Sequence, residues 1–181
     1  QLKLNGKSLS GRTEIIGRNN VVVLSPEEQP ITKGPPVKRR QFIDKMFSVS
    51  MADYVNTLKK YSRVLKQRNA ALLLVKENKS TVAELKHWDE QLVNAGARLW
   101  LMRVDLITQF QNNIEHMIQR YDSNIQFEIA YFDEAPLEKT YRKQIRDALN
   151  TDLALGRTTV GPHRDDALFI WDKRNLRNFG S

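Results

Sequence analysis

The sequence predicts an α+β fold in which a long antiparallel helical hairpin interrupts a sheet-containing body. Short segments with β-type alternation lie at both ends of the chain. Between them, two long stretches repeat apolar residues every three or four positions, as amphipathic helices do. The order β, helix, β therefore predicts one body, with the helical middle as an excursion from it.

The N-terminal 26 residues are predicted to form β-structure with turns. Asn5-Gly6 is a strong hairpin signal, and the apolar run at 21–24 suits a buried strand. Prolines and a glycine predict a loop at 27–36, which excludes a continuous helix there. A helix is predicted to begin at Pro36, because proline is tolerated in the first helical turn.

Two apolar stripes predict the long helices. The first helix covers 52–78, with Arg68 as the one break in its stripe. The second covers 81–121 and would span roughly 60 Å if it is unbroken. A turn near Asn78 would join them as a hairpin. An ordinary helical bundle is the alternative, and Gly96 is expected to be a point of bending or close packing.

The C-terminal third is predicted to return to β-structure. Alternating residues predict strands at 125–132 and again within 157–172, with a shorter helix at 136–152 between them. A Gly-Pro pair interrupts the second β segment, and a turn is predicted at 172–175.

Charge is the most informative property of the composition. The 181 residues include 29 Lys or Arg against 21 Asp or Glu, for a net charge of +8 and a pI near 9.8. This surplus favours polyanionic partners, chiefly nucleic acid. The absence of cysteine excludes disulfides and thiolate metal sites and suits a reducing cytosol. No apolar run is long enough to span a membrane.

Catalytic and metal motifs are weak. The run at 6–8 resembles the end of a P-loop, but Gln1 stands where its leading glycine would be, so a hairpin turn is the better interpretation. The three histidines are too widely spaced to form a metal-binding pair.

The densest polar cluster beside a strand is Gly-Pro-His-Arg-Asp-Asp at 161–166. One interpretation makes His163 and Asp165 or Asp166 an acid–base pair. The other, which the residues favour, is a proline-fixed turn in which Arg164 pairs with a carboxylate.

Basic residues form two groups that are able to displace counterions from phosphates. One surrounds the Pro-rich loop, where a helix N-terminus also offers backbone donors. The other shares one helical face, for which a solvated surface is the alternative. The DNA-binding candidates are Lys38, Arg39, Arg40, Lys59, Arg63 and Lys66.

Four stretches in chain order resemble the RecF family of DNA replication and repair proteins. They are Gly34-Pro35-Pro36 with Arg39-Arg40-Gln41-Phe42-Ile43-Asp44, then Leu65-Lys66-Gln67-Arg68-Asn69, then Trp88-Asp89 with Leu92 and Gly96, and finally 161–166. Each motif alone is weak, but four in order along nearly the whole chain are specific.

The resemblance implies an edge portion of an ABC/SMC-like ATPase head with an inserted long antiparallel helical arm. Residues 1–45 and 153–181 would belong to the head, and 46–152 would form the arm with a short β return. In that family two heads dimerise around ATP, which is held by one subunit's P-loop and the other's signature serine. The chain's last residues resemble the start of the signature segment, which makes Ser181 the candidate serine.

The resemblance also implies which parts of the ATPase are missing. The P-loop would precede Gln1 and the Mg²⁺-binding strand would follow Ser181, so the chain is expected to be an internal fragment. ATP and Mg²⁺ are then cofactors of the full-length protein, and neither is expected to act in this chain alone. His163, Arg164 and Asp165, with Ser181, are the candidates for a nucleotide or dimer interface.

The implied role is binding of duplex DNA at single-strand gaps in the cytoplasm. As an ATP-dependent homodimer, the full-length protein would help load recombinase with RecO and RecR. Two alternatives remain from the residues themselves. One is a basic helical-hairpin scaffold that binds another protein without DNA, and the other is a stand-alone enzyme built on His163.

Overall fold

The computed structural model describes residues 3–4, 7–8, 30–132 and 134–179. Strands β1 (Lys3–Leu4) and β2 (Lys7–Ser8) pair antiparallel, which agrees with the predicted N-terminal hairpin. The strand expected at 21–24 lies outside the described residues. Within the described ranges, no helix combines the length and apolar character needed to cross a bilayer.

The Pro-rich segment holds one short helix before the predicted one. Helix α2 (Pro36–Ser50) begins at the predicted proline. The loop prediction was wrong in one part, because Pro30–Lys33 form the one-turn helix α1. A local contact supports this turn: Arg39 of α2 donates from Nη1 to the carbonyls of Thr32 and Gly34 and so satisfies acceptors beside the end of α1.

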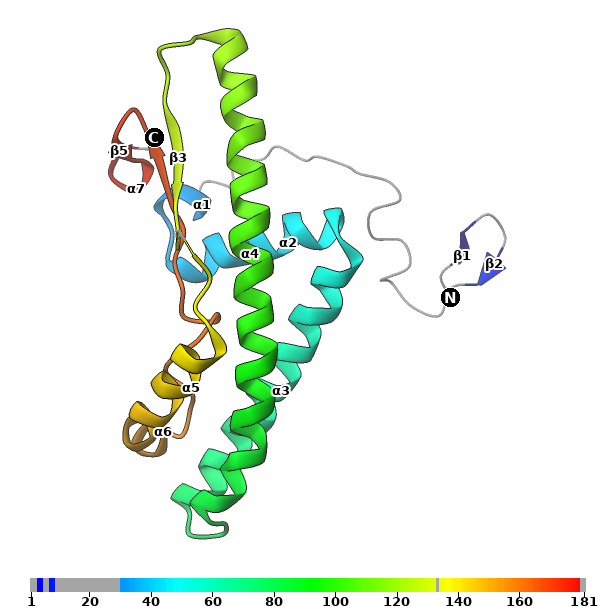
Figure 1. Ribbon diagram of the computed structural model, residues 1–181, viewed down its shortest axis with the longest axis vertical. Helices are drawn as coiled ribbons and strands as arrows, with labels where there is room; N and C mark the ends of the chain where they lie inside the picture. Colours follow the sequence, from blue (N-terminus) through cyan, green and yellow to red (C-terminus); the bar gives the residue numbers. More distant parts are fainter. Residues whose placement is uncertain (1–2, 5–6, 9–29, 133, 180–181) are drawn as a thin grey trace.

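Two long helices form the predicted hairpin. Helix α3 (Ala52–Lys76) and helix α4 (Leu85–Tyr121) lie side by side (Figure 1), with the short 3₁₀ helix η3 (Val82–Glu84) leading into α4. The turn between them contains Asn78 at φ 58°, a left-handed conformation that asparagine tolerates.

Gly96 is a point of close packing, as predicted, within an uninterrupted α4. A Cβ there would lie 2.5 Å from Cε1 of Tyr141 and 3.2 Å from Cε2 of Tyr61. A side chain at this position would therefore force the ring of Tyr141, and to a smaller extent that of Tyr61, away from α4.

The C-terminal third packs against the hairpin. Helices α5 (Glu138–Asp147) and α6 (Leu149–Leu155) replace the single helix predicted at 136–152. Strands β3 (Phe127–Ala130), β4 (Leu168–Trp171) and β5 (Arg174–Asn175) form an antiparallel sheet in that order, and α7 (Leu176–Phe179) follows. The predicted turn joins β4 to β5 through Asp172 and Lys173, both at positive φ.

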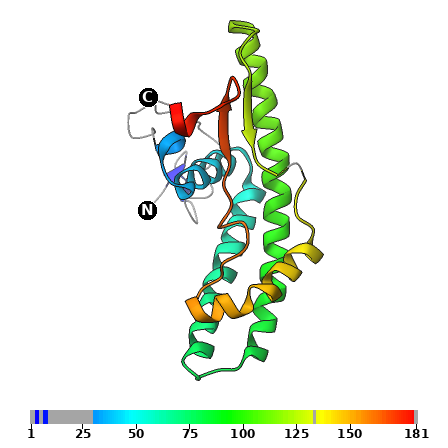
Figure 2. The ribbon, with the colours of Figure 1, turned by 90° about the vertical axis from the view of Figure 1, so that its left-hand side faces the viewer.

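The strand predicted at 158–160 is absent from this described segment, which is irregular. Side chains occupy its backbone donors: the N–H of Thr158 donates to Asn69 Oδ1, and that of Thr159 donates to Asp152 Oδ1, each at 2.8 Å. Figure 2 shows the segment between α6 and β4 running back along α3. A shared core then joins α2, α3, α4, α5, β3 and β4.

Candidate functional site

The run 161–166 is held in place by Arg103 of α4, a buried arginine that sequence reasoning did not single out. Its guanidinium donates to the carbonyl of Pro162 at 2.7 Å, to Asp44 Oδ1 at 2.9 Å and to the hydroxyl of Tyr54 at 3.0 Å. Asp165 Oδ2 lies 3.7 Å from its Nη1. Arg103 therefore connects α2, α3 and α4 to the run through one side chain.

Asp165 is bound by two further side chains, Trp100 of α4 and Tyr131, which follows β3. Its Oδ2 accepts from Trp100 Nε1 at 2.5 Å and from the hydroxyl of Tyr131 at 2.7 Å. Burial raises the pKa of Asp165, although these donors and Arg103 act against the rise. The backbone carbonyl of the same residue accepts from Arg40. The carboxyl group is thus enclosed by neighbours rather than presented to a ligand.

Asp166 forms a bidentate ion pair with Arg39. The Nε–Oδ1 and Nη2–Oδ2 distances are both 2.7 Å, and Arg39 is only 1% exposed. The carboxylate pairing predicted for Arg164 is therefore made by Arg39, while Arg164 itself is exposed. Arg39 was also a DNA-binding candidate, but its guanidinium is turned to Asp166 and to backbone carbonyls.

His163 is fixed by two hydrogen bonds. The hydroxyl of Tyr61 lies 2.7 Å from Nδ1, and Nε2 lies 3.1 Å from the carbonyl of Thr158. A carbonyl only accepts, so Nε2 carries the proton and Nδ1 accepts from Tyr61. Burial lowers the pKa of His163, and Arg164 and Arg40 lower it further. Both ring nitrogens bond to groups other than Asp165 and Asp166, so the geometry supports the structural interpretation of the run.

Acidification is expected to weaken the fold through His163. Because its folded pKa lies below the unfolded value of about 6.5, the unfolded chain binds more protons between the two values. The stabilisation is present above about pH 6.5 and is lost as the pH falls toward the folded pKa. Urea midpoints of the unaltered chain should fall more between about pH 7 and pH 5 than those of His163→Asn. Equal falls in the urea midpoints of the two proteins over this pH range would contradict the prediction. Asp165 titrates in both proteins, so its contribution cancels.

Gly161 begins the run because no larger residue fits. Its φ is +124°, which side chains rarely adopt, and a Cβ there would lie 2.9 Å from the hydroxyl oxygen of Tyr61. The glycine therefore allows the segment to approach the tyrosines of α3 and α5.

A second buried cluster surrounds Arg68, the break in the predicted stripe. Arg68 is 0% exposed, and its guanidinium lies 2.6 Å from Asp89 Oδ1, 2.6 Å from Asp152 Oδ2 and 2.7 Å from Thr158 Oγ1. Asp152 also accepts from Thr159. The cluster ties α3, α4 and α6 to the segment that leads into 161–166. A lone cation in an apolar stripe was the sequence signal for it.

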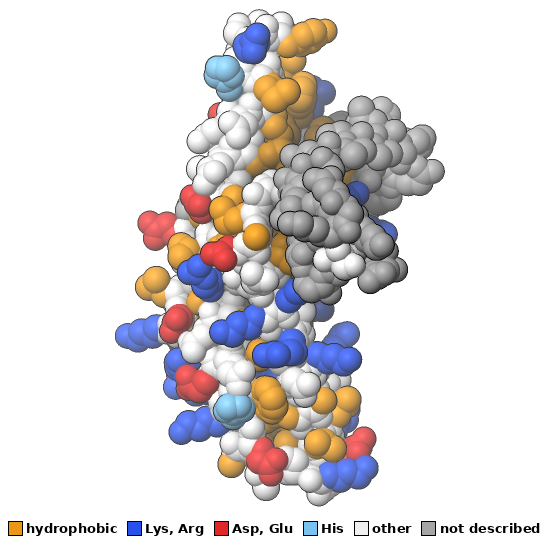
Figure 3. Space-filling view, turned by 90° about the vertical axis from the view of Figure 1, so that its right-hand side faces the viewer, with side chains coloured by type: hydrophobic (Ala, Val, Ile, Leu, Met, Phe, Trp, Pro, Cys, Tyr) orange, Lys and Arg blue, Asp and Glu red, His pale blue; other side chains and the backbone are white. Residues whose placement is uncertain are grey.

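Four of the remaining basic candidates are exposed, and one is partly buried. Lys59, Arg63 and Lys66 are exposed on α3, and within the described ranges none of them pairs with a carboxylate. Figure 3 shows Lys and Arg side chains in a band across this side of the molecule. Lys38 is exposed on α2, and Arg40 is partly buried. Ser181 lies outside the described residues.

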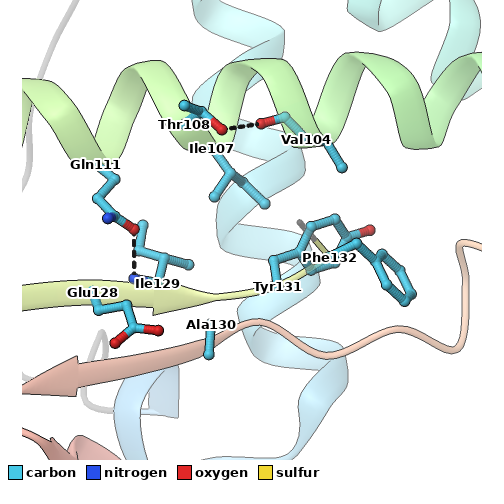
Figure 4. A pocket seen from close by; sticks show the side chains of 9 residues that line it. All are labelled: Val104, Ile107, Thr108, Gln111, Glu128, Ile129, Ala130, Tyr131 and Phe132. Carbon is cyan, nitrogen blue, oxygen red and sulfur yellow. Dashed lines mark hydrogen bonds between the residues drawn. The ribbon is translucent and has the colours of Figure 1, made fainter. Parts of the chain in front are cut away.

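A groove of about 400 Å³ runs between α4 and β3 (Figure 4). Gln111 reaches across it and accepts the backbone N–H of Ile129 at 2.9 Å, which covers part of the outer edge of β3. The residues predicted to bind DNA or nucleotide are not among those that line it. The groove meets the network around 161–166 at Tyr131, which lines the groove and donates its hydroxyl to Asp165.

Comparison with known proteins gives a consistent result. No family model matches the chain. It is 32% identical over 189 residues to the DNA replication and repair protein RecF of Heliobacterium modesticaldum and 32% over 196 residues to that of Natranaerobius thermophilus. Each match covers 99% of the chain and 50% of the relative. The chain thus spans about half the length of these curated relatives.

Solved structures agree with the sequence matches. Two structures of the recombination mediator protein RecF in the RecFOR pathway, one with ATPrS and one with ATP, resemble the chain. Their TM-scores are 0.87 and 0.89, at 30% and 29% identity. Each comparison covers 99% of the chain and 50% of the solved one.

Proposed function

The chain belongs to the RecF family, and from that premise we propose that it is the part of a RecF-type DNA repair protein that binds duplex DNA through α3. The observation that carries this proposal is the exposed basic face of Lys59, Arg63 and Lys66. Their spacing of four and three residues places them about 6 and 4.5 Å apart along one side of the helix. Such a row suits the sequence-independent neutralisation of backbone phosphates.

The α2 candidates divide between surface and structural roles. Lys38 is exposed and remains in the proposed DNA surface. Arg39 is assigned instead to the anchoring of Asp166, because both its carboxylate contacts and its burial hold it inside. A charge reversal at Arg39 would break its buried ion pair and destabilise the fold, so a loss of DNA binding could not be assigned to a lost DNA contact. The exposed α3 residues avoid this problem.

Reversing the charge of the α3 face should weaken duplex binding and its salt dependence together. The variant carries Lys59→Glu, Arg63→Glu and Lys66→Glu. Loss of three phosphate contacts should reduce the slope of log K against log salt concentration by about 2–3. Fluorescence anisotropy with a gapped duplex, without ATP, at about 50 and about 200 mM salt measures both quantities.

The chain offers a matched control on α5. Lys139, Lys143 and Arg146 have the same spacing and are also exposed. Figure 1 shows α3 and α5 on different sides of α4. Reversing the charges of this triplet changes the net charge by the same amount as the α3 variant does. It should leave most of the affinity for duplex DNA intact. Equal losses in the two triple variants would mean that net charge alone, rather than the α3 face, attracts the duplex.

The finer role is proposed from the relatives. Binding at single-strand gaps and loading of recombinase with RecO and RecR are supported by relatives placed in the RecFOR pathway. The full-length protein would act as a homodimer with ATP and Mg²⁺, in keeping with RecF structures described with ATP or ATPrS. Ser181, His163, Arg164 and Asp165 stay proposed at the nucleotide or dimer interface, where His163 and Asp165 would position the run.

One observation favours a protein contact at the free end of the arm as a second function. Leu73 is 47% exposed, and Leu155 is 51% exposed. A Cβ on Gly156 would lie 2.6 Å from Leu73 Cδ2. Leu155 precedes Gly156 in the chain, so the two exposed leucines lie near each other on the surface. A chain that bound RecR or RecO but no duplex at low salt would favour this scaffold role over the DNA role.

A further inference from the structure

The backbone of Arg164 is hydrogen-bonded within the run, whereas its side chain is exposed. Its N–H donates to the carbonyl of Gly161 at 2.8 Å, which closes a turn. The neighbouring residues are fixed by other elements, through the contacts of Pro162 with Arg103, His163 with Tyr61, Asp165 with Trp100 and Asp166 with Arg39. The run therefore presents one exposed guanidinium on a frame, the backbone of 161–166, that contacts with other elements hold in place.

Arg40 lies beside this frame and binds it through the backbone carbonyl of Asp165. The two carboxylates of the run are engaged by other arginines, Asp166 by Arg39 and Asp165 by Arg103. In the part of the chain that the structure describes, Arg40 and Arg164 therefore form no ion pair with a carboxylate.

The electrostatic balance differs between these arginines. The pKa of Arg103 is raised, because tyrosine and aspartate partners outweigh its burial. The pKa of Arg40 is lowered by burial, by Arg103 and, more weakly, by Arg164. Asp165 and Asp166 act in the other direction without reversing the shift. Burial and the neighbouring arginines thus outweigh the two carboxylates near Arg40, and a bound anion would add negative charge there.

We propose that Arg40 and Arg164 together bind a phosphate group. The inference rests on the proposed function, since DNA and a nucleotide are the phosphate sources that such a protein meets. A guanidinium donates two parallel hydrogen bonds to phosphate oxygens, and two guanidinium groups on one frame suit a dianionic or bridging phosphate. The frame also lowers the entropic cost of binding, because its backbone is already ordered.

Substitution of Arg164 tests the site with little risk to the fold, because its side chain is exposed. Arg164→Gln should weaken binding of a fluorescein-labelled duplex or of ATP about tenfold, as expected for a lost charge-assisted hydrogen bond. Arg164→Lys should retain part of the affinity through its charge. Arg157→Gln, at an exposed arginine in the same segment, is the matched control.

Each result decides the proposal. A loss confined to the duplex identifies DNA as the source of the phosphate, and a loss confined to ATP identifies the nucleotide. No change with either probe, a loss matched by Arg157→Gln, or no binding of either probe by the unaltered chain would overturn the site. The α3 variant distinguishes failure of this site from failure of the proposed function. If reversal of the α3 charges leaves duplex binding unchanged while Arg164→Gln weakens it, the α3 surface is wrong and the phosphate site stands.

Discussion

Arg68→Met should lower the free energy of unfolding by about 3–5 kcal/mol, the range found when one partner of a buried ion pair is removed. Arg68 and Asp152 are both 0% exposed, so the substitution would leave a carboxylate without its counter-charge inside the protein. Methionine keeps most of the apolar stem, which limits the contribution of lost packing. Urea unfolding followed by circular dichroism measures the change.

Two further variants identify the origin of that loss. Arg63→Met makes the same change at an exposed position of the same helix and should alter stability little. Adding Asp152→Asn to Arg68→Met removes the uncompensated charge and should recover part of the loss. If the double variant were no more stable than Arg68→Met, packing rather than the buried charge would explain the effect.

Arg103→Met should have an effect of similar size, about 3–5 kcal/mol, because it breaks the contacts with Asp44 and Asp165 together. The carbonyl of Pro162 would also lose its donor. Hydrogen exchange should therefore increase first in 158–166 rather than uniformly along the chain.

Arg98→Met is the control for Arg103, since Arg98 is an exposed arginine on the same helix, 3.9 Å from Asp53. It should leave both stability and exchange close to those of the unaltered chain. Uniform faster exchange in Arg103→Met would show general destabilisation and would argue against a specific anchoring of the run.

Local patterns predicted the long elements well, because their signals are local. The start of α2 at Pro36 follows from the chemistry of one residue, and the hairpin of α3 and α4 follows from two apolar stripes. The failures lie where side chains from other helices bond to the backbone of a segment. Thr158 and Thr159 have β-branched side chains, yet Asn69 and Asp152 take their backbone donors.

The site was only partly predictable for the same reason. The run 161–166 was recognised as a unit, but Arg103 and Trp100 lie some 60 residues away in sequence and sit in a helical pattern that gives no hint of their contacts. Arg39 showed the opposite problem. In sequence it belongs to a basic cluster, and only the position of Asp166, 127 residues later, turns it inward.

The continuity of α4 has a mechanical consequence. Its 37 residues form one rod about 55 Å long, with Arg103 and Trp100 near its middle and the hairpin turn at one end. A tilt of about 5° of such a rod displaces one end by about 5 Å relative to the other. Because α4 is unbroken on both sides of Arg103, a tilt of the helix about its contact with Pro162 would move the hairpin turn and the opposite end of the helix in opposite directions.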